Sequence, residues 1–208
     1  MRRIECRGRT LQDGKKIKFV IGLGNPGLEY RNTRHNIGFM VLKELRSRQN
    51  LGRAKRKFLA KCWRGIIDDN EVFLIEPQTY MNRSGESVRL LVNFYKPDLS
   101  DIIIIMDDMA LPIGQIRIRA SGSAGGHKGL GNIIEMLNTD KITRLRVGIG
   151  QPPEGIDPID YVLGKFSKEE KIIVSKSIKL AADAVEDWIR NGTTYVMNHY
   201  NNRKIEIN

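Results

Sequence analysis

The unbroken apolar run from Ile102 to Met106 is the feature that most constrains the fold of this chain. The run is far too short to cross a bilayer, which takes about 20 residues. It is typical of a strand that is buried on both faces, as in parallel sheets covered by helices. We therefore expect a fully buried strand at Asp101–Asp107, with helices above and below it.

Strand-like and helix-like patterns alternate along the rest of the chain. Apolar or alternating runs predict strands at Lys18–Gly22, Lys57–Arg64, Glu71–Glu76, Gln115–Arg119 and Arg144–Gly150. Helical spacing predicts helices from His35 to about Asn50, at Ser84–Tyr95, from about Gly129 to Leu137, and at Ser167–Arg190 with Ser167 as N-cap. The segment "QPPEGIDP" reads as a loop. This order predicts one α/β domain with a mixed, mostly parallel twisted sheet flanked by helices.

The two ends of the chain differ in character. Residues 1–16 are polar and basic, and we expect a disordered arm there, although a cloning remnant or a weak transit peptide would look similar. Residues 17–208 are expected to form a single domain, and nothing in them demands more than a monomer. The two cysteines, Cys6 and Cys62, form no C-x-x-C motif, which favours a reducing, cytoplasmic location.

The formal net charge of +11 favours a polyanionic partner, nucleic acid before membrane. A solvated basic surface is the plainer alternative. The three histidines are scattered and none stands at a zinc-ligand spacing, so we expect no metal site and no cofactor.

The stretch "GLGNPG" at Gly22–Gly27 spells G-x-G-x-x-G directly after a predicted strand. A dinucleotide-binding turn would also open a helix at once and would place an acidic residue at the end of the next strand, about 20 residues on. Here the helix is delayed to about His35, and Glu44 falls inside that helix. The pattern therefore disfavours a nucleotide site.

Polar residues stand in four loops that follow predicted strands or open predicted helices. In an open α/β sheet such loops converge on one crevice, so His35, Asn82, Asp107 and His127 are expected to meet there. A histidine with a carboxylate partner can act as a general base, and carboxamides can hold a carbonyl or a water. With no G-x-S-x-G motif, direct attack by water on an ester is the chemistry that fits. Taken singly, each residue could instead serve as a helix or turn cap.

Five stretches resemble bacterial peptidyl-tRNA hydrolase in order and spacing. They are "GLGNPGLEYRNTRHNIGF", "EPQTYMNRSGESV", "DDMALPIGQIRIR", "GSAGGHKGL" and "RLRVGIGQP". The resemblance covers roughly Lys18 to Asn198. It implies hydrolysis of the ester between a peptide and the 3′ ribose of tRNA, which recycles tRNA from peptides dropped by stalled ribosomes.

The resemblance also implies roles for individual residues. His35 would activate water, Asp107 would hold His35 in its basic form, and Asn25 would sense the first peptide amide of the substrate. The peptidyl–adenosine end would lie against Tyr30, Tyr80 and Asn82. Arg119 and Arg146 would grip a tRNA phosphate, which would give the positive charge a partner.

Two residues depart from the family pattern. Lys128 stands where the family usually has an asparagine that helps to hold substrate or water, and a lysine has donors but no acceptor. Ala110 stands where many members carry an aspartate.

A non-catalytic RNA-binding protein of the splicing-factor type on the same fold is therefore the alternative function, and a nucleotide-dependent enzyme is the third possibility. The intact Asn25, His35, Asn82 and Asp107 favour the hydrolase.

Overall fold

The computed structural model describes residues 17–49, 51–201 and 203. The arm predicted at residues 1–16 lies outside the described residues. Within the described part of the chain, no helix is both long enough and apolar enough to span a bilayer.

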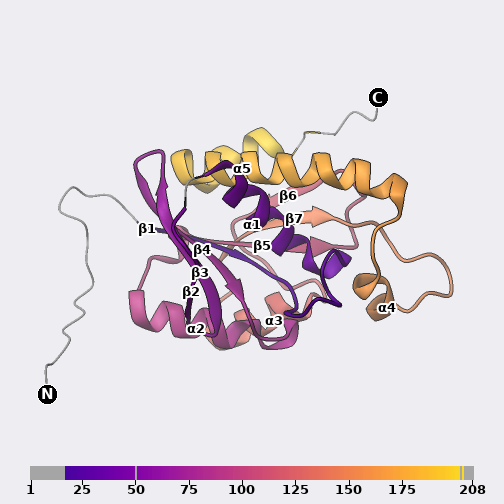
Figure 1. The fold of residues 1–208 in the computed structure, drawn as a ribbon, viewed down its shortest axis with the longest axis horizontal. Coiled ribbons are helices and arrows are strands. Elements are labelled where there is room, and N and C mark those ends of the chain that lie inside the picture. The colour runs from indigo at the N-terminus through magenta and orange to yellow at the C-terminus, as the bar shows by residue number, and fades with distance from the viewer. Residues whose placement is uncertain (1–16, 50, 202, 204–208) are drawn as a thin grey trace, which may run out of the picture.

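Seven strands form one twisted sheet (Figure 1). They are β1 (Ile17–Gly22), β2 (Lys55–Lys57), β3 (Ala60–Ile67), β4 (Asn70–Pro77), β5 (Ile102–Asp108), β6 (Ile116–Arg119) and β7 (Thr143–Gly148). Their order across the sheet is β2-β3-β4-β1-β5-β7-β6. The strands β4, β1, β5 and β7 run parallel in the middle, and antiparallel pairs close both edges. The predicted mixed, mostly parallel sheet is thus confirmed.

Helices cover both faces of this sheet. The helices α1 (Ile37–Arg48) and α5 (Lys168–Tyr200) lie on one face, and α2 (Ser84–Tyr95) and α3 (Lys128–Leu137) lie on the other (Figure 1). The short helix α4 (Pro158–Leu163) packs against the 3₁₀ turn η1 (Arg34–Asn36), outside these two layers. Two further 3₁₀ turns are η2 (Met81–Arg83) and η3 (Leu99–Asp101).

Strand β5 lies at the centre of the core, as its sequence predicts. Ile103 and Ile105 pack into the apolar cluster under α1 and α5, whereas Ile102, Ile104 and Met106 pack into the cluster under α2 and α3. Each of these side chains is buried. Because both faces of β5 are covered, the strand can carry a carboxylate that is shielded from water near its carboxyl end, and that carboxylate is Asp107.

Close approach between β1 and α1 explains the first glycine of the "GLGNPG" turn. A Cβ atom on Gly22 would lie 2.5 Å from the carbonyl oxygen of Gly38, and one on Gly38 would lie 2.4 Å from the amide nitrogen of Leu23. The turn leads to η1 and then to α1, which begins only at Ile37. The turn does not open the helix directly in sequence, as a dinucleotide-binding turn would, so the structure argues against a dinucleotide site, as the sequence indicated.

Helix α5 is longer than predicted and is broken at Gly192, where φ is 80° and ψ is −178°. Ser167 is the N-cap, as predicted, and forms a capping box with Glu170. Two contacts brace the break, from Trp188 Nε1 to Thr193 Oγ1 and from the Tyr200 hydroxyl to Asp187. The last turn of the helix is thereby directed onto β6.

Two other predictions are corrected by the structure. The strand predicted at Lys57–Arg64 is divided by a tight turn at Phe58 and Leu59, whose φ angles are 53° and 52°. The helix α4 was not predicted, because it is only six residues long and follows the Pro- and Gly-rich stretch read as a loop. Asp157 caps it by accepting a hydrogen bond from the amide of Ile159.

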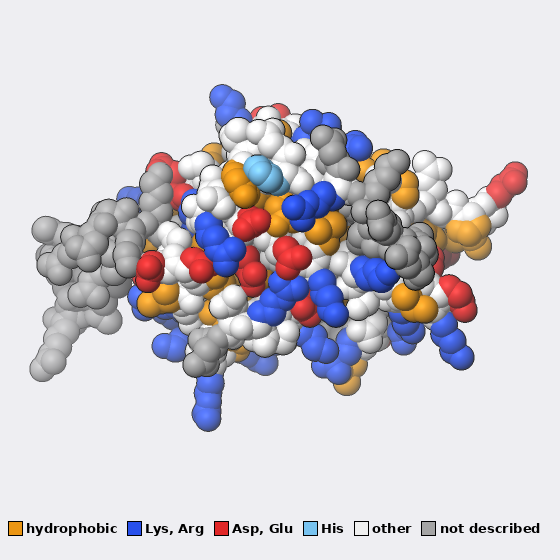
Figure 2. Space-filling model, turned by 90° about the horizontal axis from the view of Figure 1, so that it is seen from above, with side chains coloured by type: hydrophobic (Ala, Val, Ile, Leu, Met, Phe, Trp, Pro, Cys, Tyr) orange, Lys and Arg blue, Asp and Glu red, His pale blue; other side chains and the backbone are white. Residues whose placement is uncertain are grey.

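The outer face of α5 carries interspersed acidic and basic side chains, as Figure 2 shows. Arg48 lies close to Glu44, Asp183 and Glu186, and Arg190 lies close to Asp68 and Asp187. These ion pairs offset part of the positive charge on this face.

Candidate active site

The loops at the carboxyl ends of the parallel strands surround a cavity of about 890 Å³. Every segment that the sequence placed in the crevice contributes to its wall. The lining includes Asn25, His35, Tyr80, Asn82, Asp107, His127, Lys128 and Arg146, together with an apolar wall of Met109, Ile159, Val162 and Leu163. The apolar wall comes partly from α4, so the sequence analysis missed it.

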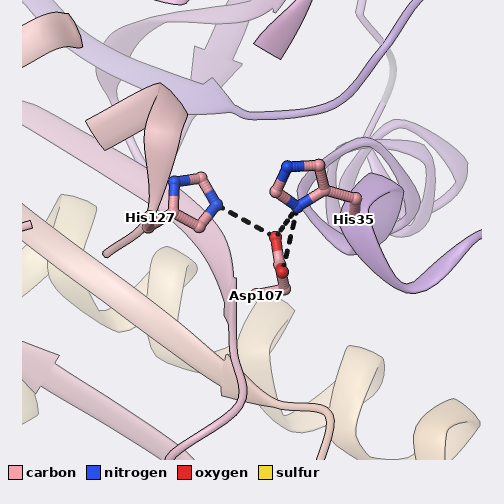
Figure 3. Close-up of side chains that lie close together, drawn as sticks. All are labelled: His35, Asp107 and His127. Atoms are coloured by element: carbon pink, nitrogen blue, oxygen red, sulfur yellow. Dashed lines mark hydrogen bonds and ion pairs between the residues drawn. The ribbon is translucent and has the colours of Figure 1, made fainter. Parts of the chain in front are cut away.

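Asp107 lies between two histidines at the base of this cavity (Figure 3). Its carboxylate oxygens are 2.9 and 3.0 Å from Nδ1 of His35, and Oδ1 is 3.0 Å from Nε2 of His127. The carboxylate is 3% exposed. His35 comes from η1, Asp107 from the carboxyl-terminal part of β5, and His127 from the N-cap of α3. The cluster therefore forms only where these three elements meet in the fold.

The hydrogen bonds determine where the imidazole protons lie. The amide of Leu130 donates to Nδ1 of His127, so the proton of that ring is on Nε2 and is donated to Asp107. Burial opposes ionisation of Asp107, but the electrostatic attraction and the donated hydrogen bonds of His127 and His35 outweigh it and hold the pKa of the carboxyl well below its ordinary value. An ionised carboxylate only accepts, so Nδ1 of His35 donates to it. In the neutral ring of His35 the lone pair is consequently on Nε2, which bonds to no described residue.

His127 is the residue whose part the sequence analysis left open. It was expected in the crevice, but only the fold shows that it shares the carboxylate with His35. The available signal was its position at the start of a helix after a glycine-rich loop, where its Nδ1 caps the helix. It donates to Oδ1 of Asp107, the oxygen that His35 also contacts, and so helps to fix the carboxylate.

We also considered a metal ion at these three residues. One possible ligand atom from each of them lies within 4.8 Å of the other two, and no other such group was found among the described residues. An ion between them would have to displace the proton from Nε2 of His127. The amide of Leu130 fixes the His127 tautomer that carries this proton. The geometry is therefore that of hydrogen-bonded side chains rather than of a ligand set.

Asn25 is held rigidly at the cavity wall. Its Oδ1 accepts from the amide of Met81 at 2.7 Å, while its backbone N–H and C=O pair with the side chain of Asn36 at 2.8 and 2.9 Å. The Nδ2 group forms no hydrogen bond with a described residue. Asn25 therefore presents a donor to the cavity, and Asn36, which the sequence analysis did not single out, fixes its backbone.

The remaining predicted residues lie around the cavity mouth. Asn82, in η2, and Lys128, at the start of α3, are exposed and line the cavity. Tyr80 is 56% exposed, and the ring of Tyr30 meets it edge-on with centroids 6.4 Å apart. Tyr30 does not itself line the cavity and lies behind Tyr80 at the rim. Ala110 also lines the cavity, and its amide donates to Asp108.

The structure separates Arg119 from Arg146. Arg146 lines the cavity and forms an ion pair with Asp108. It is opposite Arg117 in the β6–β7 ladder, whereas Arg119 is opposite Arg144, two residues farther along. Arg119 lies in a second, polar hollow of about 430 Å³, beside Arg117, Asn198 and Asn201. Residues directly opposite in a ladder share a face, so a row of guanidinium groups leads away from the cavity.

Of these arginines, Arg144 has a structural task. It is 2% exposed and donates to the carbonyl oxygens of Gly122 and Asp140, thereby fixing the glycine-rich loop before α3. Arg117 was missed by the sequence analysis, although its alternation with the buried Ile116 and Ile118 predicts that it shares the solvent face with Arg119.

Comparison with known proteins gives a consistent result. Residues 19–208 match the family model described as Peptidyl-tRNA hydrolase. A peptidyl-tRNA hydrolase of Bacillus cytotoxicus is 47% identical over 186 residues, covering 89% of this chain and 100% of the relative. One from Clostridium botulinum is 48% identical over 188 residues, covering 90% and 98%.

Solved structures agree with these sequence matches. The crystal structure of peptidyl-tRNA hydrolase from Acinetobacter baumannii is similar with a TM-score of 0.85 and 35% identity, over 90% of this chain and 96% of that one. A complex of peptidyl-tRNA hydrolase with N-propanol is similar with a TM-score of 0.86 and 34% identity, over 91% and 97% of the two chains.

The family match explains both the buried histidine–aspartate pair and the excess of basic side chains. A hydrolase that acts on peptidyl-tRNA must cleave an ester and must also bind tRNA, a polyanion. The chain belongs to the peptidyl-tRNA hydrolase family, whose members are carboxylic ester hydrolases that take part in translation.

Proposed function

We propose that His35 is the general base of peptidyl-tRNA hydrolysis and that Asp107 supports it. The observation that carries this proposal is the hydrogen bond of 2.9 Å between Nδ1 of His35 and the ionised Asp107. In the neutral ring this bond places the lone pair on Nε2, on a residue that lines the cavity. A base in this position can take a proton from a water molecule, and the buried carboxylate stabilises the resulting imidazolium.

The reaction then needs two proton transfers. Nε2 of His35 removes a proton while the water oxygen attacks the ester carbonyl, which forms a tetrahedral oxyanion. When that intermediate collapses, the bond to the ribose 3′ oxygen breaks, and the imidazolium returns its proton to the leaving oxygen. The products are a peptide with a free carboxyl group and a tRNA with its 3′ hydroxyl restored.

Donors around the cavity suit the charge that develops on the carbonyl oxygen. The carboxamide of Asn82 and the ammonium of Lys128 both line the cavity and have no side-chain partner among the described residues. Donors that are placed before the reaction stabilise an oxyanion without reorganisation. We therefore propose that Asn82 and Lys128 contact the ester end of the substrate and donate to its carbonyl oxygen.

Asn25 is suited to distinguish peptidyl-tRNA from aminoacyl-tRNA. Its Oδ1 is occupied by Met81, so the group it offers is the Nδ2 donor. A donor pairs with the carbonyl oxygen of the first peptide bond. Aminoacyl-tRNA has a free ammonium group at that point and no carbonyl, so the pairing is lost.

The tRNA portion of the substrate would follow the rim and the arginine row. The exposed ring of Tyr80, braced by Tyr30, offers a stacking surface for the terminal adenine. Arg146 and Arg119 would contact phosphates along the β6–β7 face. Such contacts position the nucleic acid without reading its sequence, which suits an enzyme that accepts many tRNAs.

We further propose that residues 17–208 act as a single domain and as a monomer in the cytoplasm. The described strands form one sheet between two helix layers, α4 packs against η1 beside them, and one chain supplies the described cavity wall. The substrate is a product of ribosomes, which supports this location.

Turnover of N-acetylaminoacyl-tRNA in EDTA, measured as release of free tRNA, tests the proposal. The protein should hydrolyse the substrate, and His35→Ala should lower kcat by roughly 10²- to 10⁴-fold, the usual worth of a general base. The matched control is His199→Ala, which removes an exposed histidine near the end of α5. Normal turnover by His35→Ala, or its loss in EDTA, would disprove the mechanism.

A further inference from the structure

The turn η1 sends three consecutive side chains in three directions. A 3₁₀ helix has three residues per turn, so neighbouring side chains diverge by about 120°. Asn36 bonds to the backbone of Asn25, and His35 bonds to Asp107. Arg34 points away from both, toward α4 and the start of α5. All three side chains therefore hold η1 in place. The hydrogen bonds of Arg34 have no role in the mechanism proposed above.

The guanidinium of Arg34 joins two separate elements by hydrogen bonds. Its two terminal nitrogens bond to the carboxylate of Glu170 at 2.9 and 3.1 Å and to the carbonyl oxygen of Lys165 at 3.0 Å, with a longer bond of 3.5 Å to the carbonyl of Tyr161. Glu170 is also the residue that closes the capping box of α5. One side chain thus connects η1 to both α4 and the first turn of α5.

Aromatic rings hold the same guanidinium in place. Its central carbon lies 4.2 Å from the ring centre of Tyr161 and 5.1 Å from that of Phe166. Arg34 is 9% exposed. A planar guanidinium that stacks on rings and also forms forked hydrogen bonds cannot be replaced by the rounded, single-point ammonium of lysine.

Backbone contacts continue this connection. The amide of Arg34 donates to the carbonyl oxygen of Gly164 at 3.0 Å, and Thr33 forms an antiparallel bridge with Lys165. The adjoining helix α4 supplies Val162 and Leu163 to the cavity wall. The same connection therefore determines where the catalytic turn and the apolar wall lie relative to each other.

We propose that Arg34 is a positioning residue for hydrolysis. By tying η1 to α4 and to the start of α5, it holds Nε2 of His35 at a fixed point beside the apolar wall. The inference rests on the proposed role of His35 as the base. A displacement of about 1 Å in a reacting group can lower the rate by roughly 10²-fold, so loss of the connection should appear chiefly in kcat.

Substitutions at Arg34 test the proposal directly. At a temperature where circular dichroism shows a folded protein, Arg34→Met should lower kcat roughly 10- to 100-fold and change KM less than about threefold, because tRNA is gripped elsewhere. Arg34→Lys, which keeps the charge but not the fork, should recover part of the loss. The matched control Arg31→Met, an exposed position in the same loop, should behave like the wild type. A folded Arg34→Met protein whose kcat stays within twofold of wild type would overturn the proposal.

Glu170→Gln decides the question even if Arg34→Met does not fold. Glutamine can still complete a capping box, but it removes the ionic partner of Arg34. We expect kcat to fall several-fold in Glu170→Gln and to stay unchanged in Ser167→Ala, which removes the cap and leaves the ion pair. Equal losses in the two variants would show that the effect passes through the end of α5, and unchanged activity in both would show that Arg34 does not act through Glu170. Either result would overturn the proposal.

Nitrogen-15 NMR of the histidine rings provides a readout that does not depend on catalysis. Arg34→Met should broaden or shift the Nδ1–H signal of His35, while the Nε2–H signal of His127, which shares Asp107, should stay in place. If both signals are unchanged, Arg34 does not position His35. If His35→Ala retains activity but Arg34→Met moves the His35 signal, the base assignment is wrong and the positioning contact stands.

Discussion

Nδ1 of His35 lies within hydrogen-bond distance of both carboxylate oxygens of Asp107, at 2.9 and 3.0 Å. An asparagine in place of Asp107 keeps the shape but removes the charge and can turn a donor toward the ring. The Asp107→Asn variant should therefore stabilise the wrong tautomer of His35 and lower kcat by roughly 10²- to 10⁴-fold. Steady-state hydrolysis of N-acetylaminoacyl-tRNA measures this loss.

A suitable control for that variant is Asp101→Asn. Asp101 is also a buried carboxylate next to β5, but it lies at the opposite end of the strand, where it forms an ion pair with Lys18 at 2.8 Å. This variant should lose stability without losing kcat. Equal kcat losses in the two variants would mean that Asp107 matters only for folding.

Asp107 should also make the stability of the protein depend on acidity. Its pKa is held below the ordinary value of 3.8 in the folded state. Its stabilising effect is therefore complete above about pH 4 and is lost as the pH falls toward the lower folded-state value. Below pH 4 the unfolding free energy of the wild type should fall more steeply than that of Asp107→Asn, by up to about 1.4 kcal/mol per pH unit. Parallel denaturation curves for the two proteins between pH 5 and pH 3 would contradict this assignment.

Local patterns were sufficient to predict the central architecture. The aliphatic run predicted the buried strand β5, and helical spacing predicted α2 with the bounds Ser84–Tyr95 that the structure has. The rule that loops meet at the carboxyl ends of parallel strands then brought His35 and Asp107 together. These predictions succeeded because burial periodicity and strand direction are both properties of short segments.

Other features depend on contacts that short segments do not record. The orientation of Asn25 is set by the amide of Met81, and the proton of His127 is set by the amide of Leu130. The turn at Phe58 and Leu59 puts two non-glycine residues at positive φ, which no composition rule indicates. Tertiary packing determines all of these, so they appear only in the folded chain.

Arg119 should contribute to tRNA binding in a way that depends on salt. It lies at the exposed end of the arginine row, in the hollow that it shares with Arg117 and Asn201. Arg119→Ala should raise KM and reduce by about 1 the slope of log(kcat/KM) against log salt concentration, the change expected for one lost phosphate contact. The matched control is Arg89→Ala, an exposed arginine on α2. An unchanged salt slope in Arg119→Ala, or an equal change in Arg89→Ala, would rule out a specific phosphate contact at Arg119.

Lys128 is a cavity residue whose side-chain type can be tested directly. It stands at the first position of α3, next to His127, and it lines the cavity. If the ammonium group serves only as a donor to the substrate, the carboxamide of Lys128→Asn can replace it and can also accept a hydrogen bond from water. We therefore expect Lys128→Asn to keep or increase kcat, whereas Lys141→Asn, at an exposed position beyond the same helix, should change nothing. The measurement is turnover of N-acetylaminoacyl-tRNA by the wild type, Lys128→Asn and Lys141→Asn. A complete loss of activity in Lys128→Asn would mean that this active site depends on the positive charge of the lysine.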